Sequence, residues 1–319
     1  VKAILLTSGC SANAAPAVSS NGTVAYMTSL AQLDIVEFPL DGSPPKPLLA
    51  TRQDEFSVAW SPNAPEFAYV SQNQIRLRRR DGTSDRAIVT GEHFPPRTDF
   101  LSPAFSPDGS RIVYVTWVNG QPPFKAWISP VAGGVPTPLG NFEGSVYGIS
   151  WSPDARWIAF NSASGGLEKI AVGSSGEPQV LSKTSCGFAP SWSPDSSKIL
   201  CRQREGLAVL PADGGEPLIL GSEYELSAWS RDMRYVYTFR NSDGRRQLGR
   251  LDENNRQFHP IAELPTEWTP TERILQTIRL SLSYDGKSRA LPVSKPGGDI
   301  WLLDGFALPP SLWQRLWRR

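Results

Sequence analysis

Acid–base or nucleophilic chemistry in this chain would depend on two histidines, because histidine is the side chain whose ordinary pKa lies near neutral pH. His93 stands in a long loop near Asp99, and His259 stands in an apolar run. A Ser-His-Asp site would need an activated serine, but the sequence has no Gly-x-Ser-x-Gly element. The two histidines also lack the ligand spacing of a zinc site. We therefore expect no enzyme activity, no catalytic residue, no metal site and no cofactor.

Cys10, Cys186 and Cys201 are an odd number of cysteines without Cys-x-x-Cys spacing. They indicate neither a disulfide framework nor a zinc site. Cys201 falls inside an apolar run and is expected to pack as a small hydrophobic residue. Cys10 and Cys186 fall in corresponding loops far apart in the chain, so we expect no bridge between them. The many Asp-Gly pairs are interpreted as turns, because none continues into the ligand pattern of a calcium loop.

Three arginines, Arg76, Arg78 and Arg80, would share one face of a strand, since strand side chains alternate with a period of two. They fit a solvated outer strand whose arginine stems cover apolar surface, with an acidic partner surface as the alternative. The net charge of +1 argues against a nucleic-acid binder, which is normally clearly basic. No apolar stretch approaches the roughly 18 residues of a membrane span.

The strands that would carry these residues are predicted from a repeated sequence motif. The motif is a large apolar residue followed by Ser-Pro and by an Asn or Asp that begins a turn. Its aligned serines are separated by intervals of 37 to 53 residues, which is typical of propeller blades. Each repeat adds apolar runs bounded by glycine turns, which predicts four strands. The clear copies begin at Trp60, Phe105, Trp151 and Trp192, and the weaker copies at Val18, Trp229 and Leu282.

We therefore predict an all-β fold, a seven-bladed β-propeller of four-stranded antiparallel blades over residues 1–306, with a short tail over 307–319. The aromatic residue before Ser-Pro should be buried between blades. The seventh repeat offers strands at 278–283, 288–294 and 299–303, and the N-terminal run at 2–7 matches the missing fourth. Closure by that run would remove an exposed sheet edge.

Two short terminal segments leave alternatives open. Residues 6–10 loosely match a lipoprotein cleavage box, but the apolar stretch before Cys10 is about four residues where a signal needs roughly 7–15. We expect instead that the chain begins inside a longer protein. In the tail, Trp313 and Trp317 are expected to pack on the propeller rim, and membrane contact is the alternative.

Recognition is predicted on the face that carries the long, variable connections, because variable loops on a rigid scaffold commonly bind ligands. The longest lie in the third, sixth and seventh repeats and hold aromatic and arginine side chains of the type enriched at interfaces. The ten candidate binding residues are His93, Phe94, Arg97, Trp117, Phe124, Arg240, Arg245, Arg246, Trp268 and Arg273.

The phrase Trp-Ser-Pro-Asp followed by an apolar strand and a later Asp-Gly-Gly turn resembles the repeat of TolB-like β-propellers over nearly the whole chain. The ending at 298–306 looks like the last blade of propellers attached to bacterial winged-helix regulators and serine/threonine kinases. The resemblance implies a non-catalytic binding or sensory propeller of a larger regulator or kinase. The alternatives are a free-standing periplasmic scaffold and the substrate-gating propeller of a serine peptidase.

The chain departs from TolB itself in having seven counted repeats rather than six and in lacking that protein's N-terminal α/β domain. The expected ligand is a protein or a small molecule, with no nucleic-acid binding and no membrane span in this region. The resemblance implies a periplasmic or extracytoplasmic setting, with the cytoplasm as the alternative.

Overall fold

The computed structural model describes the backbone of residues 2–5, 13–18, 24–51, 53–140, 144–163, 166–184, 186–266, 268–270 and 278–304. The chain divides into two compact units. Residues 33–293 form the propeller unit, and residues 1–32 with 294–319 form the terminal unit. The predicted tail at 307–319 lies outside the described residues.

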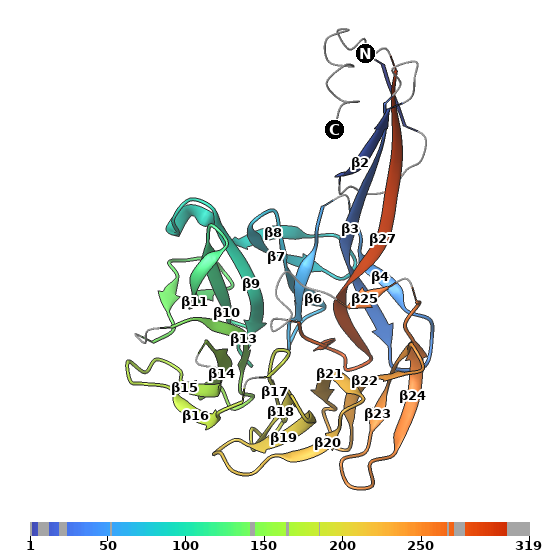
Figure 1. Cartoon of the computed structure of the whole chain (residues 1–319). Helices are drawn as coiled ribbons and strands as arrows, with labels where there is room; N and C mark the ends of the chain where they lie inside the picture. The colour runs from blue at the N-terminus through green and yellow to red at the C-terminus, as the bar shows by residue number, and fades with distance from the viewer. Residues whose placement is uncertain are drawn as a thin grey trace, which may run out of the picture. The chain divides into compact units, whose positions relative to one another are not determined.

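Five blades of the propeller unit each use four consecutive antiparallel strands (Figure 1). Their strands are short and rich in β-branched and aromatic residues, as the repeat predicts. Blade II contains β5 (Phe56–Trp60), β6 (Glu66–Ser71), β7 (Gln74–Arg79) and β8 (Asp85–Val89). Blade III contains β9 (Thr98–Phe105), β10 (Arg111–Val118), β11 (Gln121–Pro130) and β12 (Thr137–Pro138). Blade IV contains β13 (Val146–Trp151), β14 (Trp157–Ser162), β15 (Leu167–Ala171) and β16 (Gln179–Ser182). Blade V contains β17 (Ser191–Trp192), β18 (Lys198–Gln203), β19 (Gly206–Pro211) and β20 (Leu218–Gly221). Blade VI contains β21 (Tyr224–Trp229), β22 (Val236–Ser242), β23 (Arg245–Leu251) and β24 (Phe258–Glu263).

Blade I closes the ring with strands from both ends of the propeller unit. Its order is β26 (Ser281–Leu282), β27 (Ser288–Asp304), β3 (Val24–Pro39) and β4 (Lys46–Leu49). The described propeller therefore has six blades, and the prediction of seven is wrong. The first and last copies of the repeat do not make separate blades. The copy at Val18 supplies the two outer strands, β3 and β4, and the copy at Leu282 supplies the two inner strands, β26 and β27, of a single sheet.

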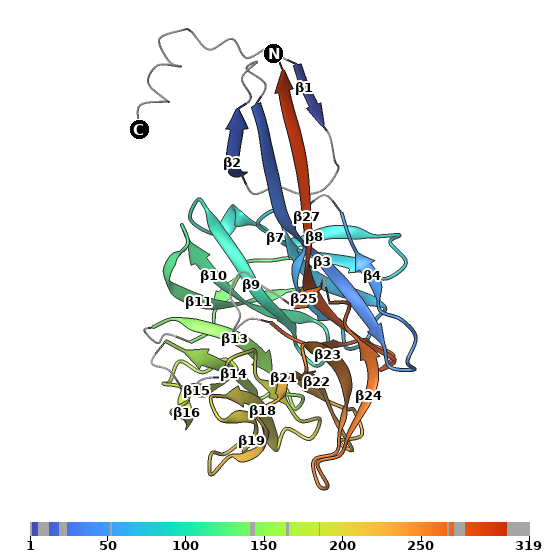
Figure 2. The same cartoon turned by 45° about the vertical axis from the view of Figure 1, so that its right-hand side comes forward.

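The predicted closure by residues 2–7 is also wrong. In the terminal unit, β1 (Lys2–Leu5) does lie beside the end of β27 (Figure 2). The two pair antiparallel, with Lys2 opposite Asp304 and Leu5 opposite Trp301. That sheet runs in the order β1, β27, β3 and β2 (Asn13–Val18). The runs at 288–294 and 299–303 are one continuous strand, so residues 2–5 pair outside the blade that they were expected to complete.

Each Ser-Pro-Asp turn is held by its buried serine. Ser106 donates from Oγ to Asp108 at 2.5 Å, and its Oγ accepts from the backbone N–H of Arg111 at 2.9 Å. The same serine–aspartate bond recurs at Ser152, Ser193, Ser230 and Ser283. Two of these turns, at Asp108 and Asp285, are Asp-Gly pairs, and the interpretation of those pairs as turns is confirmed. The turns join the two innermost strands of their blades.

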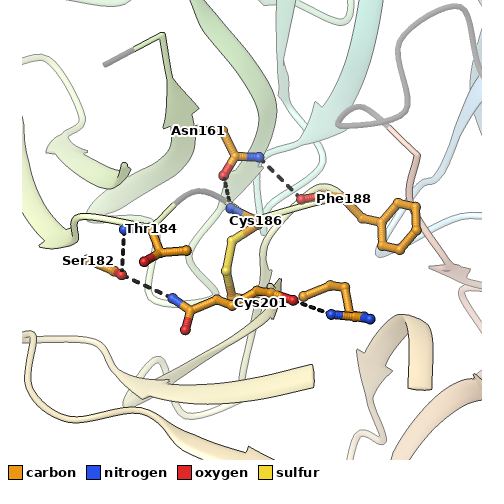
Figure 3. Close-up of a disulfide and its surroundings, with 8 residues drawn as sticks. Asn161, Ser182, Thr184, Cys186, Phe188 and Cys201 are labelled. Carbon is orange, nitrogen blue, oxygen red and sulfur yellow. Dashed lines mark hydrogen bonds between the residues drawn. A yellow bond between two sulfur atoms is a disulfide. The ribbon is translucent and has the colours of Figure 1, made fainter. Parts of the chain in front are cut away.

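Cys186 and Cys201 form a disulfide, with their Cα atoms 5.0 Å apart (Figure 3). The expectation that Cys201 is a free hydrophobic residue is therefore wrong. Asn161 of β14 accepts from the Cys186 backbone N–H at 2.9 Å and donates to the Phe188 carbonyl at 3.2 Å. The disulfide holds the segment before β17 against β18, and the Asn161 bonds hold it against β14. The spacing of the two cysteines resembles no common motif, so only the blade geometry reveals the pair.

The predicted arginines of β7 and of the residue that follows it are engaged within the propeller. Arg76 and Arg78 both pair with Asp85 of β8, at 2.9 and 3.0 Å. Arg80 pairs with Glu37 of blade I at 2.6 Å. These arginines are therefore partly exposed and paired within the chain rather than fully solvated, and recognition of an acidic partner surface stays a prediction. Tyr69 donates to Asp85 at 2.8 Å, and its own burial is the largest of the effects that raise its pKa to about 12.

Candidate functional site

A central pocket of about 410 Å³ lies at the ends of the six innermost strands. Five of these strands end in a large aromatic residue, namely Trp60, Phe105, Trp151, Trp192 and Trp229, and the sixth ends in Leu282. All six residues line the pocket together with prolines of the Ser-Pro turns. The pocket therefore opens on the face that carries these turns. The predicted burial of the aromatic residue is confirmed for the four tryptophans, whereas Phe105 is only partly buried. These aromatic residues also form the pocket wall.

Serine side chains join neighbouring innermost strands below this wall. Ser102 donates its backbone N–H to Ser57 Oγ at 3.2 Å, and Ile149 donates its N–H to Ser102 Oγ at 3.3 Å. Ser57 and Ser102 occupy the left-handed region, with φ of 55° and 53°, at shifts in the strand register. Such β-bulges redirect a strand and turn a side chain toward a functional site. Here they turn the serines toward the adjacent blade.

Arg279 occupies the corresponding position of blade I, three residues before Leu282. Its guanidinium donates to the carbonyl of Pro103 in blade III at 3.1 Å and to the carbonyl of Ile149 in blade IV. Blades III and IV lie across the ring from blade I, whose inner strands contact blades II and VI. The side chain therefore crosses the axis of the propeller and lines the pocket.

Arg289 of β27 is a second pocket arginine and is 2% exposed. It donates to the carbonyl of Leu280 at 3.5 Å and to that of Trp229 in blade VI, and its guanidinium lies 4.8 Å from the Tyr237 ring centre. Its Nε atom has no hydrogen-bond partner among the described residues. Burial lowers the pKa of Arg289 to about 9, which shows how poorly its surroundings solvate the charge.

Arg231 is the third arginine of the pocket and lies at its exposed rim. It donates to the carbonyls of Ser283 and Tyr284 across the junction between blades VI and I. None of the described lining residues is Asp, Glu, His or Cys. The described site is therefore a pocket with aromatic walls whose positive charge is concentrated at one blade junction.

Nine of the ten predicted binding residues fall within the described part of the chain, and none of these nine lines this pocket. In blade III, Phe94 packs edge-on against Phe100 and Trp127, and Trp117 stacks on Phe124 with ring centres 5.1 Å apart. These three candidates are thus packed mainly on neighbouring rings. His93 lines a separate cavity of about 180 Å³, and Arg97 is exposed in the same loop.

The remaining candidates belong to the last third of the chain. Arg240 lies over the Phe258 ring at 4.2 Å. Arg245 and Arg246 pair with Glu263 and Glu225, at 3.9 and 3.5 Å. Trp268 packs partly buried against the core between blades VI and I, and Arg273 lies outside the described residues. The structure does not test recognition by this face, which stays a prediction.

Sequence reasoning missed the three pocket arginines, although a signal was present. Arg231 stands where other copies have the proline of Ser-Pro, and Arg289 stands where the second strands have an apolar residue. Such departures from the repeat mark positions whose residue type is not set by the shared blade packing alone. Within the described residues there is also no group of three or more His, Cys, Asp or Glu side chains suited to hold a metal ion.

Comparison with known families matches residues 71–272 to the TolB beta propeller domain. Among solved structures, a protein described as TolB from Agrobacterium tumefaciens superposes with a TM-score of 0.63 at 16% identity, covering 83% of this chain and 99% of that chain. TolB from Acinetobacter baumannii gives 0.54 at 19% identity, covering 84% and 66%. A puromycin-hydrolyzing peptidase of Mycobacterium tuberculosis gives 0.55 at 16% identity, covering 78% and 44%.

No curated protein matches the sequence. At these identities the structural matches establish the fold alone. Among the described residues, no helix is long and apolar enough to span a bilayer.

Proposed function

The chain belongs to the TolB β-propeller family, and from that premise we propose that it is a non-catalytic scaffold that binds a protein partner outside the cytoplasm. The observation that carries the proposal is the central pocket, to which all six blades contribute. Aromatic walls with a few arginines are typical of protein-recognition surfaces, where Trp and Arg are the commonest anchors. The two TolB structures among the matches favour a TolB-like scaffold over the sensory part of a regulator or kinase.

The Cys186–Cys201 disulfide supports the extracytoplasmic setting independently of the family. Disulfides persist in oxidising compartments and are rare in the cytoplasm, where thiol systems reduce them. Both cysteines are buried, so the bond belongs to the folded core of the blade IV–V junction rather than to an exposed redox site. A bacterial periplasmic location fits both this bond and the family.

The peptidase match supports no catalytic step in this chain, because it covers 44% of that protein and reflects the fold. The described pocket lining contains no histidine, cysteine or carboxylate. A general base or nucleophile would have to come from one of these types or from an activated hydroxyl beside them. The lining therefore favours binding over turnover.

Site-specific cross-linking tests the proposal. A benzophenone side chain placed at Leu282, in the pocket, should capture a partner in cells that produce the protein, whereas the same group at exposed Arg204, outside the pocket, should not. Alkylation of thiols before lysis should find Cys186 and Cys201 oxidised. A pocket position that captures nothing, or captures only what Arg204 captures, would contradict the scaffold function.

A further inference from the structure

Three residues that depart from the repeat, Leu282, Arg289 and Arg231, line the same pocket. Arg289 faces Leu282 across the two inner strands of blade I. The equivalent pairs in the other blades are an aromatic residue facing Phe67, Ile112, Ile158, Ile199 or Val236, all fully buried. Blade I therefore replaces a core apolar residue with arginine and replaces the aromatic partner with the smaller leucine. In blade VI, Arg231 replaces the proline that four other turns carry.

Burying Arg289 should be costly. Taking a charged side chain out of water costs several kcal/mol unless an opposite charge and full hydrogen bonding compensate. Among the described residues Arg289 makes no salt bridge, its described acceptors are two backbone carbonyls, and its Nε has no partner. Five other blades solve the same packing position with an apolar side chain. The arginine is therefore a poor choice for stability, which points to a ligand.

The shape and charge of the pocket narrow the class of that ligand. Positive charge from Arg231 and Arg289 meets no described carboxylate in the lining. Two of the five N–H donors of the Arg289 guanidinium already contact carbonyls, which leaves three, the Nε–H among them. A singly charged, planar carboxylate suits one guanidinium better than a phosphate, which carries more charge and needs more donors. The volume of about 410 Å³ is that of a small-ligand or side-chain site.

We propose that the central pocket binds a carboxylate group of the partner polypeptide, with Arg289 and Arg231 as its charged ligands and the tryptophan walls packed on the adjoining apolar atoms. This inference rests on the proposed scaffold function and names the chemistry that it recognises. The carboxylate can belong to an acidic side chain or to a chain terminus. Both carry the same group, and the probes below separate them.

The test follows the intrinsic tryptophan fluorescence of the whole chain, to which the four pocket tryptophans contribute. The first probe is an acetylated and amidated Gly-Gly-Glu-Gly-Gly peptide, and its matched control has Gln in place of Glu. The second probe is acetyl-pentaglycine with a free carboxyl terminus, which carries no side-chain acid. Inorganic phosphate is the third. We expect one of the carboxylate peptides to bind at least about tenfold more tightly than the Gln peptide and than phosphate.

The variant Arg289→Ile restores the apolar residue of the other blades. It should fold with an equal or higher melting temperature and lose carboxylate binding by at least about tenfold. Arg231→Gln, at the exposed rim, keeps the core intact and should weaken binding in the same direction. Arg204→Gln removes an exposed arginine outside the pocket and should change nothing.

Equal binding of the Glu and Gln peptides would overturn the carboxylate inference and leave the scaffold function standing. Tight binding of phosphate alone would also overturn it, as would full carboxylate binding by Arg289→Ile and Arg231→Gln. Carboxylate binding together with a failure of cross-linking at Leu282 would keep the carboxylate specificity of the pocket and reject the protein partner, so the two proposals fail separately.

Discussion

Arg80 donates to Glu37 at 2.6 Å and thereby joins the segment after β7 in blade II to strand β3 in blade I. The Glu37 carboxylate is 1% exposed and also accepts from Ser288 of β27. Arg80 further contacts Asp285 at 3.4 Å. One buried carboxylate therefore ties both halves of the composite blade to its neighbour, at the place where the ring closes.

Removing one member of this pair should destabilise the propeller strongly. Arg80→Met leaves Glu37 buried with only Lys46, 3.7 Å away, as a described countercharge. Breaking a buried ion pair typically costs about 3 kcal/mol or more of unfolding free energy. Glu37→Gln and the double variant complete the cycle, measured by urea unfolding. If the two single losses simply add in the double variant, the residues do not interact as described.

Loss of the disulfide should lower stability without changing the fold. Cys186 and Cys201 are 15 residues apart, and a loop of that size is worth about 3 kcal/mol through the constraint on the unfolded chain. The variant with both cysteines changed to Ala should melt at a lower temperature than the oxidised protein. Alkylation of the denatured, unreduced chain should label Cys10 alone, and all three cysteines after reduction. Three labels before reduction would show that the bond is absent.

The serine–aspartate turns predict a defined acid sensitivity. Hydrogen bonds from Ser106 and Ser110 lower the pKa of Asp108 from 3.8 to about 2. Since the folded-state pKa lies below the unfolded value, this carboxylate stabilises the protein fully above pH 3.8, and the contribution is lost as the pH falls toward 2. Ser106→Ala should raise the pKa of Asp108, measured by carboxyl NMR titration. Asp195, whose pKa is lowered mainly by Ser193, should not move and serves as the control.

Recognition on the variable-loop face remains to be tested with a partner in hand. Arg245 is 70% exposed and its contact with Glu263 is long, at 3.9 Å, so its guanidinium is accessible. If this face contributes an anchor, Arg245→Ala should weaken the partner's affinity by about 1–3 kcal/mol with little loss of stability. Calorimetry measures the partner's affinity for Arg245→Ala and for the matched control Arg204→Ala. An unchanged affinity would confine recognition to the central pocket.

The local features of the fold could be predicted from the sequence because they depend on neighbouring residues. The turn at Ser106 and Asp108, and the strands beside it, follow from short-range chemistry. The number of blades could not be predicted from local sequence in the same way. The copy at Val18 has neither the aromatic residue nor the proline of the others, and closure pairs β3 with β27 across nearly the whole chain. The site was hidden for the same reason, since Arg231, Arg279 and Arg289 gather only when the ring is closed.

Arg279 has one more consequence, which concerns the route that a ligand can take. Its side chain bridges from blade I to carbonyls on blades III and IV, so the axis of the ring is blocked at that level. A polypeptide cannot be threaded through the propeller from one face to the other unless this arginine swings aside. A partner must instead insert a protruding segment that enters and leaves through the same opening of the pocket. Dissociation should then require the bound segment to withdraw through the opening by which it entered. The propeller would hold one fixed segment of the partner and would not let a polypeptide slide along its axis.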